Sequence, residues 1–171
     1  VPMGNRTPAY VENVREHLIS PGQFYFDKNK KEVLYYALPG QKMESGKVEA
    51  ILAVEETLVK LDGAQNHNWA SVTFEFGTWL RPMQGPGYVE EQSGACDICP
   101  YGVQLQDGCG LHDSAVVTPG NVAVSAGQNI QFANCTFQHL GAYATSALNA
   151  SQNVSWSGCA FWDVSAGAIA L

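Results

Sequence analysis

Apolar and polar positions toward the end of the chain follow a pattern that repeats with a fixed offset. Between Val122 and Leu171, eight residues recur 24 positions later. The identical pairs are Ala123/Ala147, Ala126/Ala150, Gln128/Gln152, Asn129/Asn153, Cys135/Cys159, Phe137/Phe161, Ala142/Ala166 and Ala144/Ala168. A repeat of about 20 to 50 residues predicts a solenoid, in which each unit buries its apolar face by stacking on the next.

The periodicity inside the repeat is that of β-strands. Ile130 and Phe132 alternate with polar neighbours, and Cys135 and Phe137 do the same a few positions later. Alternation with a period of two is typical of strands, whereas an amphipathic helix repeats every 3.6 residues. We therefore expect short stacked strands, with Asn129 and its equivalent at a turn.

An earlier segment, residues 65–74, fits the same pattern. Asn66, Trp69, Val72 and Phe74 occupy the slots of Asn129, Phe132, Cys135 and Phe137. The offset of 63 residues exceeds two repeats by about 15, and we assign this excess to a Gly- and Pro-rich loop, Arg81–His112. The remaining rung strands are expected at Val48–Val54, Thr57–Leu61, Ala115–Val117 and Val122–Val124.

The residues before the rungs predict a β-hairpin. Phe24 and Phe26 alternate with polar or smaller neighbours, residues 27–31 have the composition of a turn, and Val33–Ala37 has that of a second strand.

These elements divide the chain into a lead-in segment, residues 1–47, and parallel rungs, residues 48–171, interrupted at 81–112. The chain starts at Val1 without methionine, and it ends at Leu171 where a further rung is expected. We therefore expect it to be a fragment of a longer polypeptide.

Two parts of the chain resemble one group of proteins. The strand-only repeat, with asparagine at a turn and aromatic residues in register, resembles the right-handed parallel β-helix of the pectin-lyase-like superfamily. Residues 12–41, ENVREHLISPGQFYFDKNKKEVLYYALPGQ, resemble a segment that leads into the helix in uncharacterised β-helix repeat proteins and in β-helix glycoside hydrolases. The resemblance implies an all-β fold: a right-handed parallel β-helix with an N-terminal hairpin and one long cysteine-containing loop.

Composition narrows the choice of partner. Nine basic and sixteen acidic side chains give a net charge of −7, which disfavours nucleic acid and anionic membrane surfaces. No apolar run reaches the roughly 18 residues that a membrane span needs.

Four Asn-x-Ser/Thr sequons favour a secreted, extracellular glycoprotein. They begin at Asn5, Asn134, Asn149 and Asn153. Asn134 and Asn149 are the better glycosylation candidates, because Asn134 neighbours an inward cysteine and Asn149 falls in a turn. Asn153 has a structural alternative, a ladder with Asn129 across successive turns.

The cysteines of the loop allow several interpretations. Cys96, Cys99, Cys109 and His112 have the spacing of a zinc knuckle. An extracellular setting favours a disulfide, Cys96 with Cys109, with Cys99 as the alternative partner; free thiols are the third possibility. We predict neither a metal nor another cofactor.

Cys135 and Cys159 share one slot in successive rungs, at a spacing that a disulfide tolerates. Because cysteine is also a good small core residue, we favour a reduced pair in the core.

His139 and Asp163 share one slot in successive rungs. An imidazole beside a carboxylate is a candidate acid–base pair, or a pair that binds sugar hydroxyls. Glycoside hydrolases require two carboxylates, and the partner of Asp163 is expected at Asp107, at Asp113 or beyond the chain's end. Strand alternation opposes this site, because it places His139 on the side of Phe137. The alternative is that both are turn residues satisfied by backbone groups.

Aromatic side chains supply flat faces for sugar rings. Trp162 is predicted to point outward, and Trp79 and Tyr88 lie in a segment that resembles a loop of the same β-helix proteins; Tyr101 is a further candidate. The resemblance thus implies an extracellular carbohydrate-active protein, similar to a glycoside hydrolase or a polysaccharide lyase, that acts on or binds a polysaccharide. The alternatives are a glycosylated structural or adhesive protein that self-associates into filaments through open helix ends, and a non-catalytic glycan-binding module. Whether the chain is an enzyme stays open at this point.

Overall fold

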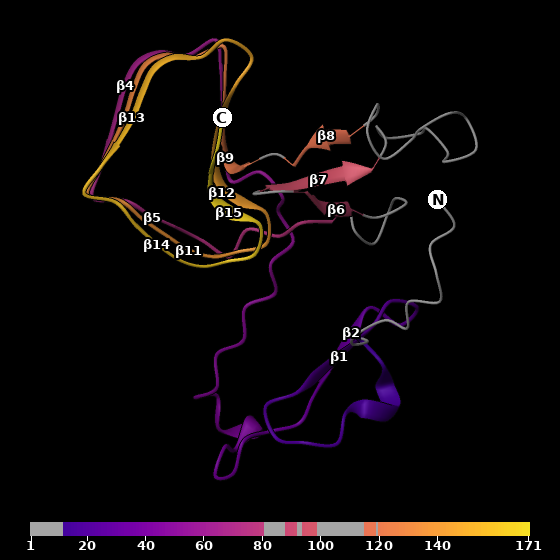
Figure 1. The fold of residues 1–171 in the computed structure, drawn as a ribbon. Coiled ribbons are helices and arrows are strands. Elements are labelled where there is room, and N and C mark those ends of the chain that lie inside the picture. Colours follow the sequence, from indigo (N-terminus) through magenta and orange to yellow (C-terminus); the bar gives the residue numbers. More distant parts are fainter. Residues whose placement is uncertain (1–11, 81–87, 92–93, 99–114, 119) are drawn as a thin grey trace, which may run out of the picture. The chain divides into compact units, whose positions relative to one another are not determined.

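The computed structural model describes residues 12–80, 88–91, 94–98, 115–118 and 120–171 (Figure 1). The chain divides into two compact units, residues 1–50 and 51–171. Within the described ranges the helical elements are two single 3-10 turns, η1 (Arg15–His17) and η2 (Met43–Ser45). No helix in these ranges is long and apolar enough to cross a membrane.

The first unit contains one antiparallel strand pair. Strands β1 (Phe24–Asp27) and β2 (Glu32–Tyr35) pair in register, with Phe24 opposite Tyr35. The turn between them is fixed by Asp27, whose carboxylate accepts hydrogen bonds from the backbone of residues 29 and 30 at 3.0 Å. This is the Asx-type turn that aspartate favours.

The second unit is a solenoid of parallel strands that form three sheets. One sheet has the order β15 (Gly167–Ala170), β12 (Tyr143–Leu148), β9 (Gly120–Ser125) and β3 (Val59–Asp62). The second has the order β13 (Gln152–Ser157), β10 (Gln128–Ala133) and β4 (Gln65–Ala70). The third has the order β14 (Ala160–Val164), β11 (Thr136–Leu140) and β5 (Thr73–Glu75).

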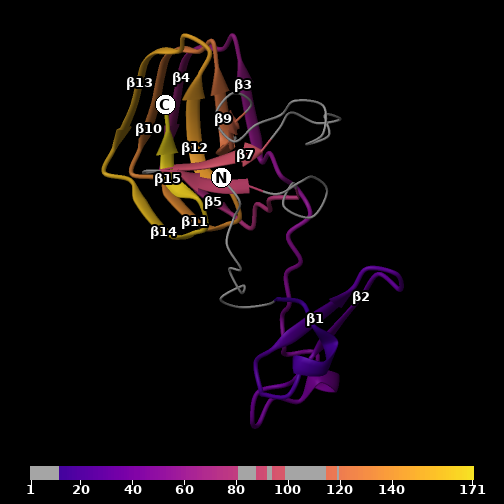
Figure 2. The same ribbon diagram turned by 45° about the vertical axis from the view of Figure 1, so that its right-hand side comes forward.

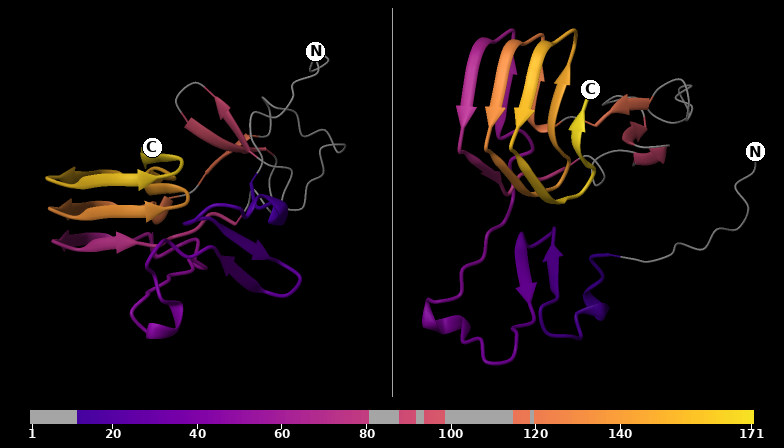
Figure 3. Two further views of the ribbon diagram at one scale, coloured as in Figure 1. Left: turned by 90° about the horizontal axis from the view of Figure 1, so that it is seen from below. Right: turned by 60° about the vertical axis from the view of Figure 1, so that its left-hand side comes forward.

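Each pass of the chain adds one strand to each sheet, so the unit has the architecture of a parallel β-helix. Figures 2 and 3 show the strands of successive passes side by side. The register confirms both predicted offsets: Phe137 pairs with Phe161, 24 residues later, and with Phe74, 63 residues earlier.

Two predicted rung strands are wrong. Residues 48–54 form no strand, and Ile51, Leu52 and Val54 are exposed; an apolar run alone does not make a strand where no neighbouring strand supplies hydrogen bonds. The segment Ala115–Val117 is a strand, β8, but it pairs antiparallel with β7 (Gly94–Ile98), which pairs in turn with β6 (Tyr88–Glu91). The predicted loop 81–112 thus contains two strands of a separate sheet.

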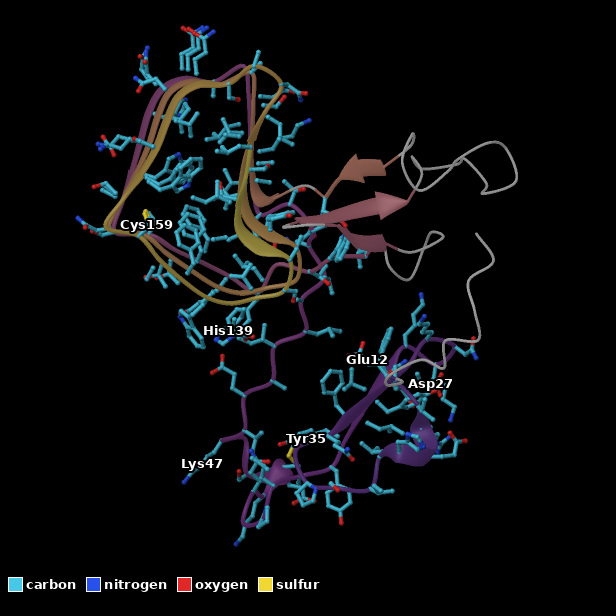
Figure 4. All side chains as sticks on the ribbon, viewed as in Figure 1. Glu12, Asp27, Tyr35, Lys47, His139 and Cys159 are labelled. Atoms are coloured by element: carbon cyan, nitrogen blue, oxygen red, sulfur yellow. The ribbon has the colours of Figure 1, made fainter. Side chains whose placement is uncertain are left out.

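The core consists of aromatic columns that run from rung to rung (Figure 4). Phe137 is fully buried and stacks on Phe74 and Phe161 with ring centroids 5.0 and 4.8 Å apart. In the neighbouring column, Phe132 stacks on Trp69 and Trp156. Each such pair contributes about 0.5–1.5 kcal/mol beyond area burial, so the columns hold the rungs in one register.

Cys135 and Cys159 are free thiols, as predicted. Each sulfur lies within hydrogen-bonding distance of backbone carbonyls: Cys135 of Trp69 and Ala133, and Cys159 of Phe132 and Ser157. The pair therefore serves as small core residues.

Asparagines form a ladder along one corner of the solenoid. Asn129 donates from Nδ2 to Oδ1 of Asn66 at 2.9 Å and accepts from Nδ2 of Asn153 at 2.8 Å. All three have φ between 52° and 59°, a left-handed conformation that asparagine tolerates better than most residues. The ladder predicted for Asn129 and Asn153 is confirmed, and it extends one rung further.

Replacing Asn129 should expose the contribution of this ladder. We expect Asn129→Ala to lower the free energy of unfolding by about 2–3 kcal/mol, because both amide bonds are lost and a Cβ remains at positive φ. Asn129→Gly relieves the backbone conformation and should lose about 1–2 kcal/mol. Urea unfolding followed by circular dichroism measures both losses. The control is Gln131→Ala on the same strand, which should lower the free energy of unfolding by less than about 0.5 kcal/mol. Equal stability of Asn129→Ala and wild type would contradict the ladder's role.

Candidate functional site

The outer face of the β5–β11–β14 sheet carries side chains that differ from rung to rung. Glu75, Gln138 and Trp162 lie in register on these three strands, and we call them the strand row. Gln138 donates from Nε2 to Oε2 of Glu75 at 2.5 Å, and Trp162 donates from Nε1 to Oε1 of Gln138 at 2.8 Å. The Trp162 side chain is 51% exposed. The strand row is therefore a hydrogen-bonded line that ends in an open aromatic face.

The next residue of each rung forms a second line, the corner row, made of Phe76, His139 and Asp163. The rings of Phe76 and His139 stack at 5.4 Å with an interplanar angle of 7°. His139 Nδ1 lies 2.6 Å from Asp163 Oδ2. Because a carboxylate only accepts, the proton of this bond is on Nδ1. His139 also meets Trp162 edge-on at 4.5 Å, so the two rows form one cluster.

The backbone of the corner row explains why these side chains point outward. Phe76, His139 and Asp163 have φ of 62°, 53° and 50°. A residue in this left-handed conformation turns the chain and breaks strand alternation. Leu140, the next residue, is buried instead. Figure 4 shows His139 on the outside of the solenoid.

The expectation that His139 faces the core is therefore wrong. The alternative, that backbone groups satisfy His139 and Asp163, also differs from the structure, because the two side chains bond each other.

The corner row stands out among the positive-φ positions. Several other corners of the solenoid hold asparagine or glycine, which suit this conformation, and the small residues Ser71, Ala126 and Ala150 adopt it as well. Aspartate and histidine are enriched there as well, but a bulky aromatic such as Phe76 is an outlier. Backbone outliers of this kind cost about 1–3 kcal/mol and cluster at functional sites.

Electrostatically, the site is open rather than buried. The His139 and Asp163 side chains are 34% and 66% exposed, so the pair resembles a surface ion pair worth about 0–1 kcal/mol. In the described ranges, no group of three or more His, Cys, Asp or Glu side chains is placed to hold a metal ion.

Other predicted site residues lie elsewhere. Trp79 is half-buried, and its backbone packs against Gly141 at the next corner. The Tyr88 backbone opens β6, and the Cys96 backbone lies in β7. The positions that fall outside the described residues are Asn5, Cys99, Tyr101, Asp107, Cys109, His112 and Asp113. The predicted disulfide, its zinc alternative and the predicted second carboxylates therefore stay predictions.

The sequons of the solenoid occupy different environments. Asn134 is exposed at a positive-φ corner. Asn149 is exposed and donates from Nδ2 to Ser125 Oγ at 2.9 Å. The Nδ2 of Asn153 is engaged in the asparagine ladder.

Two members of the cluster were not predicted from the sequence. Glu75 and Phe76 precede Gln138 and His139 by 63 residues, the offset that placed Phe74 under Phe137. Extending that alignment by two positions would have added a second carboxylate to the face of Asp163.

Comparison with known proteins gives one informative likeness. No family model matches the sequence, and no curated protein matches it. A solved structure titled "Glycoside hydrolase" is similar with a TM-score of 0.73 and 26% sequence identity. The likeness covers 92% of this chain and 28% of that chain, so this chain spans less than a third of that protein's length. At a coarse level, the likeness supports the predicted β-helix and carbohydrate-active function.

The His139–Asp163 contact should be measurable as a coupling energy. In a double-mutant cycle with His139→Gln and Asp163→Asn, we expect coupling of about 0.5–1 kcal/mol at low ionic strength, falling as salt is added. The matched control is Lys60 with Asp62, a 3.6 Å pair with side chains 68% and 62% exposed, which should couple less. Unfolding free energies in urea provide both values; no coupling at low salt would contradict the contact.

Proposed function

We propose that this chain belongs to an extracellular, carbohydrate-active protein, and that the strand row and the corner row bind a polysaccharide. The observation that carries the proposal is the continuous cluster from Glu75 to Asp163, with an exposed tryptophan bonded into it. The likeness to a glycoside hydrolase supports the same class of ligand. The sequons support the extracellular location, and the repeat supports a right-handed helix of the pectin-lyase-like kind.

The chemistry of the cluster suits a sugar chain. The face of Trp162 is apolar and stacks on the C–H face of a pyranose, while neighbouring polar groups bond to hydroxyls. Gln138 and His139 hold Trp162 in place, so little side-chain freedom is lost on binding. The three strands span about 10 Å across the rungs.

Trp162 provides the direct test of binding. We expect Trp162→Ala to weaken polysaccharide binding at least about tenfold, because the stacking surface is lost. Tyr36→Ala removes another exposed aromatic, in the first unit, and should leave affinity unchanged. Isothermal titration against a polysaccharide panel measures both. Unchanged affinity of Trp162→Ala for every bound polysaccharide would refute this site.

A second candidate function is hydrolysis of the bound chain, favoured by the two carboxylates of the cluster. Glu75 and Asp163 lie on β5 and β14, with β11 between them, and Asp163 follows the register partner of Glu75 by one residue, so their backbones are about 10 Å apart. Inverting glycosidases place their carboxylates about 6.5–9.5 Å apart, and retaining ones about 5–5.5 Å. A backbone separation of about 10 Å favours the wider, inverting arrangement of the two carboxylates, in which one group protonates the leaving oxygen and the other activates water.

Hydrolysis can be separated from binding with isosteric variants. If both carboxylates are catalytic, Glu75→Gln and Asp163→Asn should each lower the release of reducing ends at least about 100-fold, with affinity changed only a few-fold. Asp62→Asn, on a different sheet, is the matched control. Turnover at the wild-type rate in Asp163→Asn would remove Asp163 from catalysis.

A further inference from the structure

Charge is distributed unevenly between the two units of the chain. Residues 1–50 carry seven basic and six acidic side chains, whereas residues 51–171 carry two basic and ten acidic ones. The two basic residues of the second unit are Lys60 and Arg81. The second unit, which carries the candidate site, therefore has a net charge of −8, and the first has +1.

The outer face of the β5–β11–β14 sheet contains no lysine or arginine on its three strands. Lys60 lies on β3 in a different sheet and is paired with Asp62. The remaining cationic candidate of the cluster is His139, and it is already bonded to Asp163. A ligand on this face therefore meets Glu75 and Asp163 without a free cation on those strands to balance its own charge.

The hydrogen-bond donors of the cluster are directed at the cluster itself. Gln138 Nε2 donates to Glu75, Trp162 Nε1 donates to Gln138, and His139 Nδ1 faces Asp163. Besides the second N–H of the Gln138 amide, the groups left for a ligand include the carboxylate oxygens of Glu75 and Asp163 that accept no bond within the cluster, and these are acceptors.

We infer that the cluster selects an uncharged glycan over a polyuronate; this inference rests on the proposed function. A neutral polysaccharide supplies the hydroxyl donors that such acceptors require, and its C–H faces stack on Trp162. A polyuronate brings a carboxylate on each sugar, which repels Glu75 and Asp163 and finds no lysine or arginine on the three strands.

The full chain can be tested by isothermal titration against three classes of polysaccharide. The neutral class is a β-glucan, an arabinoxylan and a galactomannan; the anionic class is polygalacturonate and alginate; and the cationic class is chitosan oligosaccharide. We expect at least one neutral polymer to bind at least about tenfold more tightly than either polyuronate. Its affinity should change less than about twofold between about 20 and 500 mM NaCl, because no ion pair forms.

Charge removal tests the cause of the selectivity. The double variant Glu75→Gln, Asp163→Asn should raise the affinity for polygalacturonate at least about fivefold. The ratio of the affinity for the neutral polymer to the affinity for polygalacturonate should fall accordingly. Asp62→Asn removes a charge on another sheet and should leave this affinity ratio unchanged. If the double variant retains the wild-type circular dichroism spectrum and its affinity ratio is unchanged, the inference is overturned.

The outcomes separate the two levels of the proposal. If a polyuronate binds most tightly, or if chitosan binds most tightly in a salt-sensitive way, the inference of an uncharged ligand is wrong. The proposal that the chain binds carbohydrate is unaffected by either result. Absence of binding to all three classes overturns carbohydrate binding itself, and with it this inference.

Discussion

The parallel register between rungs is the constraint on which the rest of the second unit depends. Backbone hydrogen bonds pair each residue with the residue one repeat away, so equivalent side chains lie about 4.8 Å apart along the stack. A side chain in a slot therefore packs on the side chain in the same slot of the next rung. Phe137 between two phenylalanines and Asn129 between two asparagines are consequences of that geometry, since like groups there stack or exchange amide bonds.

The same constraint separates architecture from chemistry. Where a slot holds the same residue in each rung, the stack explains the residue; where it holds different residues, stacking supplies no reason for the difference. The strand row and the corner row are two adjacent lines of the second kind, and their members still contact each other across the rungs. A binding face built on a repeat requires neighbouring positions whose residues differ from rung to rung and whose side chains still contact one another.

The sequence alone predicts the regular rungs well, because stacking of equivalent strands requires the same repeat and the same alternation that the sequence shows. The register of Phe74, Phe137 and Phe161 follows directly from it. The orientation of His139 does not, because a single left-handed residue shifts alternation, and histidine carries no unique signal for that conformation. The strand predicted at Val48–Val54 is wrong for a different reason: its apolar run suits a strand, but strand formation depends on a partner strand that the local pattern cannot reveal.

The corner row also shows why one repeat cannot make the site. Phe76 of the first rung packs flat against the imidazole of His139 in the second, and that ring places its Nδ1 against Asp163 in the third. The orientation of the imidazole is thus fixed by an aromatic ring of the preceding rung, which stacks on it, and by a carboxylate of the following rung, which contacts its Nδ1. Phe76 occupies a backbone conformation that bulky residues avoid, so stacking on His139 offsets part of that cost. The order aromatic, imidazole, carboxylate is accordingly a property of three consecutive rungs, and the nearby column of Phe74, Phe137 and Phe161 holds those rungs in register.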